Sequence, residues 1–321
     1  MTQDISYLGN MMAFMQYAIQ VLMSFLVLTI FFLMLPRANV SAGRVNEVLH
    51  THNKITWKPS TLGVPDTPPS VEFKNVSFGY SHAEKYVLED ISFKANSGEI
   101  TAIIGSTGSG KSTLIKLIPR FYDTKKGEIL VNGINVKDYN DLDLMKRIGY
   151  VPQKGILFSG TIASNIKFGA PNATDEEIKE AARIAQAEEF INKLEEGYNS
   201  HIAEGGTNVS GGQKQRLSIA RAICKNPEIY IFDDSFSALD MKTDKKLRES
   251  LAPLVRKSVT IIVAQRVSTI KDADQILVMD KGRIVSRGTH KELLGSCKVY
   301  QEIVKSQLSE KEYEEELKNV A

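Results

Sequence analysis

The chain has 321 residues, 42% of them hydrophobic, and its 40 Lys and Arg nearly balance its 38 Asp and Glu, which leaves a net charge of +2. This length is enough for one large domain with additional elements, and the balanced charge, without a basic stripe, argues against a nucleic-acid partner. The two cysteines, Cys224 and Cys297, lie far apart without the spacing of a metal site, so we expect ordinary reduced residues and no redox chemistry.

The first predicted element is a membrane-spanning helix over residues 11–35, which contain no charged side chain. As a helix this stretch would be about 37 Å long, enough to cross a hydrocarbon core of roughly 30 Å. A cleavable signal peptide is the alternative, but the stretch is too long for one, and Asp4 stands where a signal peptide is basic. Because Arg37 and Arg44 follow the span, the positive-inside bias places the C-terminal bulk in the cytoplasm. Residues 1–54 are therefore expected to form a transmembrane helix and its cytoplasmic extension.

The soluble part is expected to begin after a linker at residues 55–70, which contain four prolines. A domain over residues 71–306 follows, with strands predicted at residues 71–78, 88–93, 100–104, 148–151, 229–232, 260–263 and 276–279. The first two alternate apolar with polar residues as antiparallel neighbours do, whereas the others are short apolar runs separated by helical patterns, which predicts a covered, largely parallel sheet. Residues 175–194 fit a helical insertion, and the acidic residues 307–321 are expected to form a solvated helix or frayed tail.

A glycine-rich loop follows the strand at residues 100–104 and opens a helix. In such a loop, backbone N–H groups and the positive end of the helix converge on a phosphate group. Lys111 can neutralise the β- and γ-phosphate oxygens, and the Ser112 hydroxyl can bind the magnesium ion that bridges them. The predicted nucleotide-binding residues of this loop are Gly105, Ser106, Thr107, Gly108, Ser109, Gly110, Lys111, Ser112 and Thr113.

A carboxylate completes the predicted magnesium site. Asp233 closes the apolar strand at residues 229–232, where a carboxylate can hold magnesium through water. The alternative is an ordinary strand-end or helix-capping carboxylate, which the upstream phosphate loop makes the weaker interpretation. The sequence therefore predicts ATP and Mg2+ as cofactors.

At this point the chain resembles the nucleotide-binding domain of an ATP-binding cassette (ABC) transporter, specifically the C-terminal part of an exporter-type half-transporter. Besides the phosphate loop, the resemblance rests on three motifs that follow in order: Gln153 after Tyr-Val-Pro, matching the Q-loop; Ser210, Gly211, Gly212 and Gln213, matching the family signature; and the D-loop motif at residues 237–240. It implies an α/β fold, the P-loop NTPase cassette with a mostly parallel RecA-like core sheet, an antiparallel β subdomain and an α-helical subdomain, preceded by one transmembrane helix.

The resemblance also assigns roles to single residues. It implies that Gln153 takes part in catalysis and contributes to the metal site beside Ser112 and Asp233. It implies that Tyr80 stacks on adenine, although an exposed strand tyrosine is the alternative interpretation. Glu204, just before the signature, resembles part of the cross-talk segment of exporters.

The signature implies a partner subunit. Ser210 opens a helix whose N–H groups can meet a γ-phosphate, and the two glycines after it allow close backbone approach. In the family that phosphate belongs to the other subunit, so two cassettes enclose two ATP molecules. We therefore expect a second half-transporter subunit, a lipid bilayer and an exported substrate of unknown class as partners, and a multi-pass cell-membrane protein with a cytoplasmic cassette.

Two catalytic positions depart from the family pattern. Asp234 stands where a glutamate usually follows the magnesium aspartate, and Gln265 stands where a histidine normally contacts the γ-phosphate. The shorter carboxylate is withdrawn by about one C–C bond, and an amide cannot take the positive charge of an imidazole. We expect a site that binds ATP and hydrolyses it poorly, in a heterodimer whose other subunit supplies the glutamate and histidine; a homodimer is the alternative.

Two alternative functions compete with this interpretation. One predicted span cannot line a transport route, so the sequence is either a C-terminal piece of a longer protein or a truncated product that acts as an ATP-gated dimerisation module. A soluble cassette ATPase of the DNA-repair class would need basic surface or a long coiled-coil insertion, and the membrane span argues against it.

Overall fold

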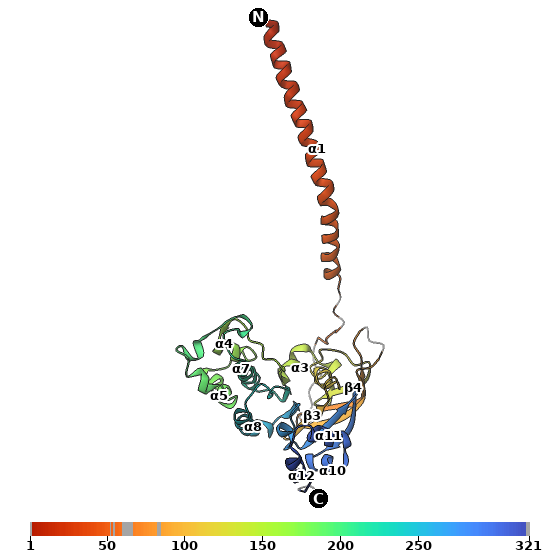
Figure 1. The fold of residues 1–321 in the computed structure, drawn as a ribbon, viewed down its shortest axis with the longest axis vertical. Coiled ribbons are helices and arrows are strands. Elements are labelled where there is room, and N and C mark those ends of the chain that lie inside the picture. Colours follow the sequence, from red (N-terminus) through yellow and green to blue (C-terminus); the bar gives the residue numbers. More distant parts are fainter. Residues whose placement is uncertain (1, 52, 54, 60–66, 82–84, 319–321) are drawn as a thin grey trace. The chain divides into compact units, whose positions relative to one another are not determined.

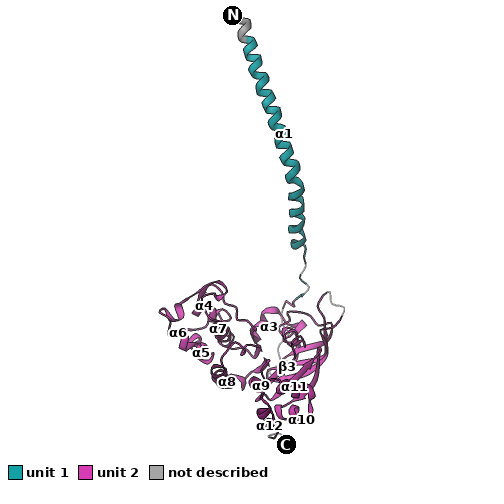
Figure 2. Ribbon diagram, in the orientation of Figure 1, with its two compact units in different colours: residues 1–56 teal, residues 57–321 magenta. Residues whose placement is uncertain are grey.

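A computed structural model describes residues 2–51, 53, 55–59, 67–81 and 85–318 (Figure 1). The chain divides into two compact units, Met1–Thr56 and Trp57–Ala321 (Figure 2).

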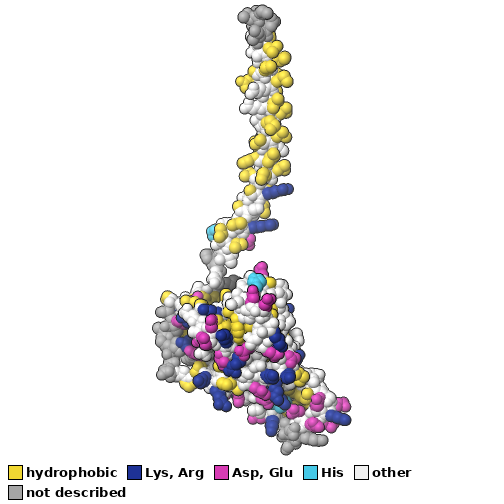
Figure 3. Space-filling model, turned by 90° about the vertical axis from the view of Figure 1, so that its left-hand side faces the viewer, with side chains coloured by type: hydrophobic (Ala, Val, Ile, Leu, Met, Phe, Trp, Pro, Cys, Tyr) yellow, Lys and Arg dark blue, Asp and Glu magenta, His cyan; other side chains and the backbone are white. Residues whose placement is uncertain are grey.

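The first unit is the helix α1 (Thr2–Leu49), which exposes hydrophobic side chains over most of its length on the face that Figure 3 shows. Its 48 residues would extend about 72 Å. The helix is longer than the predicted span and continues through Pro36, while its end at Leu49 lies before the predicted boundary at residue 54. Among the described residues it is the one helix long and apolar enough to cross a membrane. Its large apolar side chains are exposed, which is the pattern of a helix that meets lipid or other apolar helices.

The second unit is built on a six-stranded sheet. Its strands are β3 (Ile100–Gly105), β6 (Ile148–Val151), β9 (Ile229–Asp233), β10 (Val259–Val263), β11 (Gln275–Asp280) and β12 (Arg283–Gly288). They are ordered β12-β11-β3-β10-β9-β6, and all neighbours are parallel except β12, which pairs antiparallel with β11. The largely parallel sheet predicted from the apolar runs is confirmed, and β12 was not predicted.

An antiparallel sheet, ordered β2-β1-β4-β5, forms a second layer. Its strands are β1 (Ser70–Phe78), β2 (Leu88–Asn96), β4 (Lys126–Val131) and β5 (Ile134–Asn135). A further short pair, β7 (Gly160–Thr161) and β8 (His201–Ile202), lies in the helical region. The predicted antiparallel partnership of the first two strands is confirmed.

The helices fall into groups around these sheets (Figure 1). A helical subdomain contains α4 (Ile162–Lys167), α5 (Asp175–Ile184), α6 (Glu188–Ile191) and α7 (Gly211–Cys224). The predicted insertion at residues 175–194 is split into α5 and α6, because Gln186 adopts a left-handed conformation with φ 56°. The remaining α-helices are α2 (Lys111–Lys116), α3 (Asp141–Arg147), α8 (Met241–Val255), α9 (Val267–Ile270), α10 (His290–Ser296), α11 (Lys298–Lys305) and α12 (Glu310–Lys318), and the short 3-10 turns are Val136–Asp138, Gly197–Asn199 and Glu204–Gly206.

Two hydrophobic cores lie on opposite faces of the six-stranded sheet. Alternate residues of each central strand face opposite sides, so Ile104 joins the core shared with the helical subdomain and Ile103 joins the core shared with the antiparallel sheet. Parallel strands covered on both faces require this continuous apolar character. Both cysteines are free, as expected. The acidic tail is less solvated than predicted, because Leu308 and Tyr313 pack against the first core.

Candidate nucleotide-binding site

The phosphate loop connects the end of β3 to the start of α2. A Cβ atom on Gly105 would lie 2.1 Å from the carbonyl oxygen of Met279, so no larger residue fits there. Gly110 has φ +98°, a conformation that L side chains rarely adopt, and it caps α2. The tight turn therefore depends on glycine at both ends of the loop.

Lys111 lies at the first position of α2, with its ammonium group folded into the loop. Its Nζ donates to the carbonyl oxygens of Gly105 and Ser106, both at 2.8 Å. Burial lowers the pKa of the Lys111 ammonium, while the carboxylates of Asp234 and Asp233 act in the opposite direction. A phosphate group can replace these carbonyl acceptors, so the charge is already held at the place where the loop would bind an anion.

Asp233 ends β9 and is held by two hydroxyl donors. Ser112 Oγ donates to its Oδ1 at 2.9 Å, and the Tyr150 hydroxyl, from the neighbouring strand β6, donates to its Oδ2 at 3.1 Å. Burial and the charge of Asp233 raise the pKa of Tyr150 well above its usual range, which keeps the hydroxyl protonated. The carboxylate is thereby oriented from both sides.

The three predicted catalytic residues meet at one atom. Oδ2 of Asp234 accepts hydrogen bonds from Gln153 Nε2 at 3.0 Å and from Gln265 Nε2 at 2.8 Å. Asp234 is buried and adopts φ 48°, outside the ordinary range of a non-glycine residue. Burial raises the pKa of its carboxyl, although these hydrogen bonds partly offset that effect. Residues from three separate loops thus converge here.

A cavity of about 410 Å3 opens between these groups. It is lined by ten predicted site residues and two valines: Thr107, Gly108, Gly110, Lys111, Ser112, Thr113, Gln153, Asp233, Asp234, Gln265, Val87 and Val263. Among the described residues no cluster of three or more His, Cys, Asp and Glu side chains could hold a metal by itself. The donor set fits magnesium bound together with a polyphosphate, because such an ion takes only one or two protein ligands and completes its shell with phosphate oxygens and water.

Tyr80 lies beside the loop but does not line this cavity. Its hydroxyl is 3.1 Å from the Thr113 hydroxyl, and its ring makes edge contacts with Phe78 and Tyr122. With 39% of its surface exposed, the ring has room for an additional partner.

The signature residues lie apart from the cavity, at the start of α7. Ser210 and Gln213 form a reciprocal capping box, in which each side chain accepts from the other's backbone N–H, at 3.3 and 2.8 Å. Ser210 and Gly211 are exposed. Glu204 is likewise exposed, and Asp240 of the D-loop motif caps α8 by accepting from Lys242 N at 3.1 Å.

Sequence reasoning missed two residues that connect these parts. Tyr150 holds Asp233, as described above. Gln215, only 1% exposed, joins the signature helix α7 to the segment that carries Gln153: its Oε1 accepts from Gly155 N at 2.9 Å and its Nε2 donates to Pro152 O at 3.1 Å. A polar residue on the apolar face of a helix was the available signal for Gln215.

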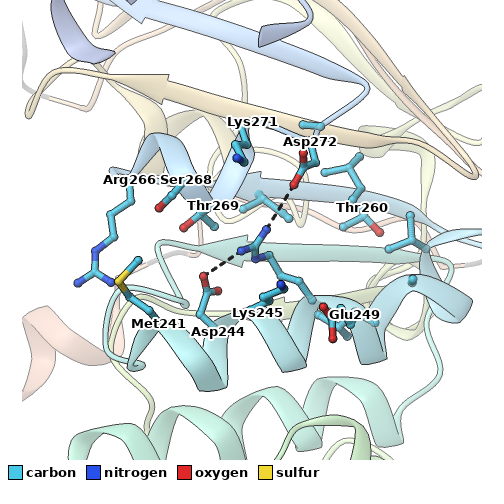
Figure 4. A pocket seen from close by; sticks show the side chains of 17 residues that line it. Met241, Asp244, Lys245, Glu249, Thr260, Arg266, Ser268, Thr269, Lys271 and Asp272 are labelled. Atoms are coloured by element: carbon cyan, nitrogen blue, oxygen red, sulfur yellow. Dashed lines mark ion pairs between the residues drawn. The ribbon is translucent and has the colours of Figure 1, made fainter. Parts of the chain in front are cut away.

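A larger cavity, about 880 Å3, lies between α8 and the segment 260–273 (Figure 4). Arg248 crosses it, with ion pairs to Asp244 at 3.3 Å and to Asp272 at 3.9 Å. None of the predicted nucleotide-binding residues lines it. The smaller cavity is the candidate site because the predicted phosphate-binding residues converge there.

Comparison with known proteins gives a consistent result. Residues 88–237 match the family model described as ABC transporter. An uncharacterized ABC transporter ATP-binding protein of Mycobacterium tuberculosis is 46% identical over 310 residues, which cover 93% of this chain and 52% of that protein. A putative multidrug export ATP-binding/permease protein of Bacillus subtilis is 44% identical over 260 residues, covering 81% and 45%.

A solved structure is also similar: a bacterial Atm1-family ABC exporter with ATP bound superposes with a TM-score of 0.80 at 37% identity, over 86% of this chain and 48% of that chain. The chain therefore spans about half the length of the relatives that it matches.

Proposed function

This chain contains a domain of the ABC transporter family, and we propose that the chain is the ATP-binding part of an exporter subunit. It would use ATP binding and hydrolysis between two cassettes to drive export of a substrate across the cell membrane. The cassette would lie on the cytoplasmic side, since Arg37 and Arg44 follow the apolar span.

One observation carries the proposal: Lys111, Ser112 and Asp233 converge on the cavity that also receives Gln153 and Gln265. Lys111 would neutralise phosphate oxygens, and Ser112 and Asp233 would hold magnesium, with Gln153 beside them. Magnesium, when bound, would neutralise the charge that develops on the terminal phosphate. Tyr150 keeps Asp233 oriented for this task through the second carboxylate oxygen.

The same geometry supports impaired hydrolysis at this site. A general base accepts a proton from water, and the two amides that donate to Oδ2 of Asp234 reduce the basicity of that oxygen. The aspartate is also shorter than glutamate by one methylene, and misplacement of about 1 Å can lower a rate roughly a hundredfold. Gln265 donates a hydrogen bond but takes no positive charge.

The exposed signature supports a second subunit as partner. Ser210 and Gly211 are exposed and do not line the chain's own cavity, so they would serve a phosphate bound by another cassette. We propose a heterodimer whose other subunit has its own catalytic glutamate and histidine, with a homodimer as the alternative.

The test uses the full-length subunit together with its candidate partner in lipid nanodiscs, with ATPase turnover as the measurement. We expect the partner's Glu→Gln variant to abolish turnover and Asp234→Asn to leave most of it. If Asp234→Asn abolishes turnover as completely as the partner's Glu→Gln variant, the proposal that the two sites differ in hydrolysis is wrong. Lys111→Ala is the control that should remove nucleotide binding at this chain's site.

A gain of function complements that test. With Asp234→Glu and Gln265→His combined, we expect hydrolysis at this site to rise roughly tenfold to a hundredfold, because the base is longer and the imidazole can take charge. The rise would be measured with the partner's own site inactivated. No rise, with nucleotide binding intact, would show that other features limit this site.

A further inference from the structure

A glutamine near the C-terminus clamps the segment that carries Gln265. Gln307 follows α11 in the chain, 42 residues after Gln265. Its Oε1 accepts from the backbone N–H of Val267 at 2.8 Å, and its Nε2 donates to the backbone carbonyl of Gln265 at 2.7 Å. One amide side chain thus satisfies both backbone groups that flank Arg266.

The backbone that carries Gln307 is fixed by the core. Tyr300 and Val304, both fully buried, lie one turn apart on the same face of α11. Gln307 lies just after the helix, and the next residue, Leu308, packs against the first core. The Tyr300 hydroxyl also lies 2.7 Å from His290 Nδ1 of α10. The clamp therefore acts from a rigid support.

The segment that Gln307 holds is supported by packing only in part. Gln265 and Arg266 are exposed, and α9, which follows, is a single turn of four residues. On the side facing α8, the large cavity is lined by Arg266, Ser268 and Thr269 (Figure 4). Val267 and Ile270 anchor α9 in the first core, so it is Gln265 and Arg266, before the helix, that packing alone constrains weakly.

The segment is in turn connected to the catalytic residues. Gln265 Nε2 donates to Asp234 at 2.8 Å, and Arg266 donates to the carbonyl of Ser237, in the D-loop motif, at 3.3 Å. A shift of the backbone at Gln265 would move its amide relative to the cavity. The contacts run from α11 through Gln307 to both loops.

We propose that Gln307 is a positioning residue, through which the C-terminal helices set the reach of the Gln265 amide toward the terminal phosphate of ATP. This inference rests on the proposed function, because it assumes that Gln265 faces that phosphate. It predicts that the clamp affects recognition of the third phosphate and leaves binding of the first two unchanged.

The first arm of the test needs no nucleotide. In the full chain, Gln307→Met keeps a similar volume and loses both hydrogen bonds. We expect the Val267 amide to exchange with deuterium at least about fivefold faster, since its acceptor is gone. Gln301→Met is the matched control: Gln301 lies on α11, the helix that Gln307 follows, and its amide donates to Leu294 O at 2.6 Å, away from Gln265. Unchanged exchange at Val267 in Gln307→Met would overturn the clamp.

The second arm measures the preference of the site for MgATP over MgADP by equilibrium binding. We expect Gln307→Met to reduce this preference roughly threefold to tenfold, about the net effect of one or two hydrogen bonds, with ADP affinity unchanged. Gln307→Asn, which keeps the amide but is one methylene shorter, should act in the same direction. In a double-mutant cycle, Gln307→Met should add no further loss to Gln265→Ala.

The outcomes distinguish the proposed role of Gln265 from the proposed role of Gln307. If the unmodified chain shows no preference for ATP that depends on Gln265, the proposed role of that residue fails. If it shows this preference and Gln307→Met retains it in full, or if the two variants are additive, the positioning role fails. An equal loss in Gln301→Met would assign the effect to general destabilisation and would also overturn it.

Discussion

At the scale of residues, two adjacent carboxylates are given different environments. Asp233 receives hydroxyl donors on both oxygens, from Ser112 and Tyr150, and faces the phosphate loop. Asp234 is buried in a left-handed backbone conformation and receives two amides on one oxygen. Different environments can give two neighbouring carboxyl groups different roles. The contacts of Asp233 support its proposed role in metal binding, whereas the two amides hold the side chain of Asp234 in place.

The buried carboxylate of Asp234 has a consequence for stability. Burial raises the pKa of the Asp234 carboxyl above its ordinary value. As the pH rises, this carboxyl therefore ionises at a lower pH in the unfolded chain than in the folded chain, and the difference destabilises the fold. We expect Asp234→Asn to be more stable than the unmodified chain at neutral pH. The stability advantage of this variant should shrink as the pH falls through the pKa of Asp234 in the folded chain toward the ordinary pKa of an aspartate.

Thermal unfolding at a series of pH values checks this prediction. A variant that is less stable at pH 7, or whose advantage does not change with pH, would contradict it.

At the scale of elements, two helices of the helical subdomain are started by local sequence. Both α5 and α7 begin with a capping box, formed by Thr174 with Glu177 and by Ser210 with Gln213. Such caps satisfy the free N–H groups of the first turn with side chains only three residues apart. The signature therefore has a structural role in addition to the proposed contact with a partner's phosphate.

These two caps form a matched pair of variants. Ser210→Ala and Thr174→Ala should each cost about 1 kcal/mol of unfolding free energy, because each removes one capping hydroxyl. Only Ser210→Ala should also lower turnover of the assembled pair, since Thr174 has no proposed contact with ATP. Denaturant unfolding and ATPase assays on the same preparations separate the two effects. An equal loss of turnover in both variants would leave the signature with a structural role alone.

At the scale of the whole molecule, the two units differ in whether their apolar side chains are exposed or buried. The helix α1 exposes large apolar side chains along its length, whereas residues 57–321 enclose two cores on the two faces of one sheet. A domain with its own core does not need the other unit to bury its apolar surface. The boundary at Thr56 and Trp57 is therefore a natural place to separate them.

A fragment comprising residues 57–321 tests this division. We expect it to be soluble without detergent, to bind MgATP, and to unfold within about 0.5 kcal/mol of the cassette in the full chain, since distant and independent parts contribute additively. Calorimetry in matched buffers is the measurement. Aggregation or a markedly lower stability of the fragment would show that α1 or its lipid surroundings support the cassette.

The sequence by itself determined the phosphate loop, the apolar span, the parallel apolar strands and the order of the family motifs. Each of these features depends on residues that lie close together in the sequence, through alternation, capping or a glycine turn, so a short segment is enough to predict it. Only the tertiary structure showed that Tyr150 holds Asp233, that Gln215 joins two motifs and that Gln307 clamps Gln265. The reason is the strand order β12-β11-β3-β10-β9-β6, which departs from the order in the chain and brings together residues such as Gln153 and Asp234, 81 positions apart. No local period encodes contacts at that separation, because they depend on how the whole sheet is assembled.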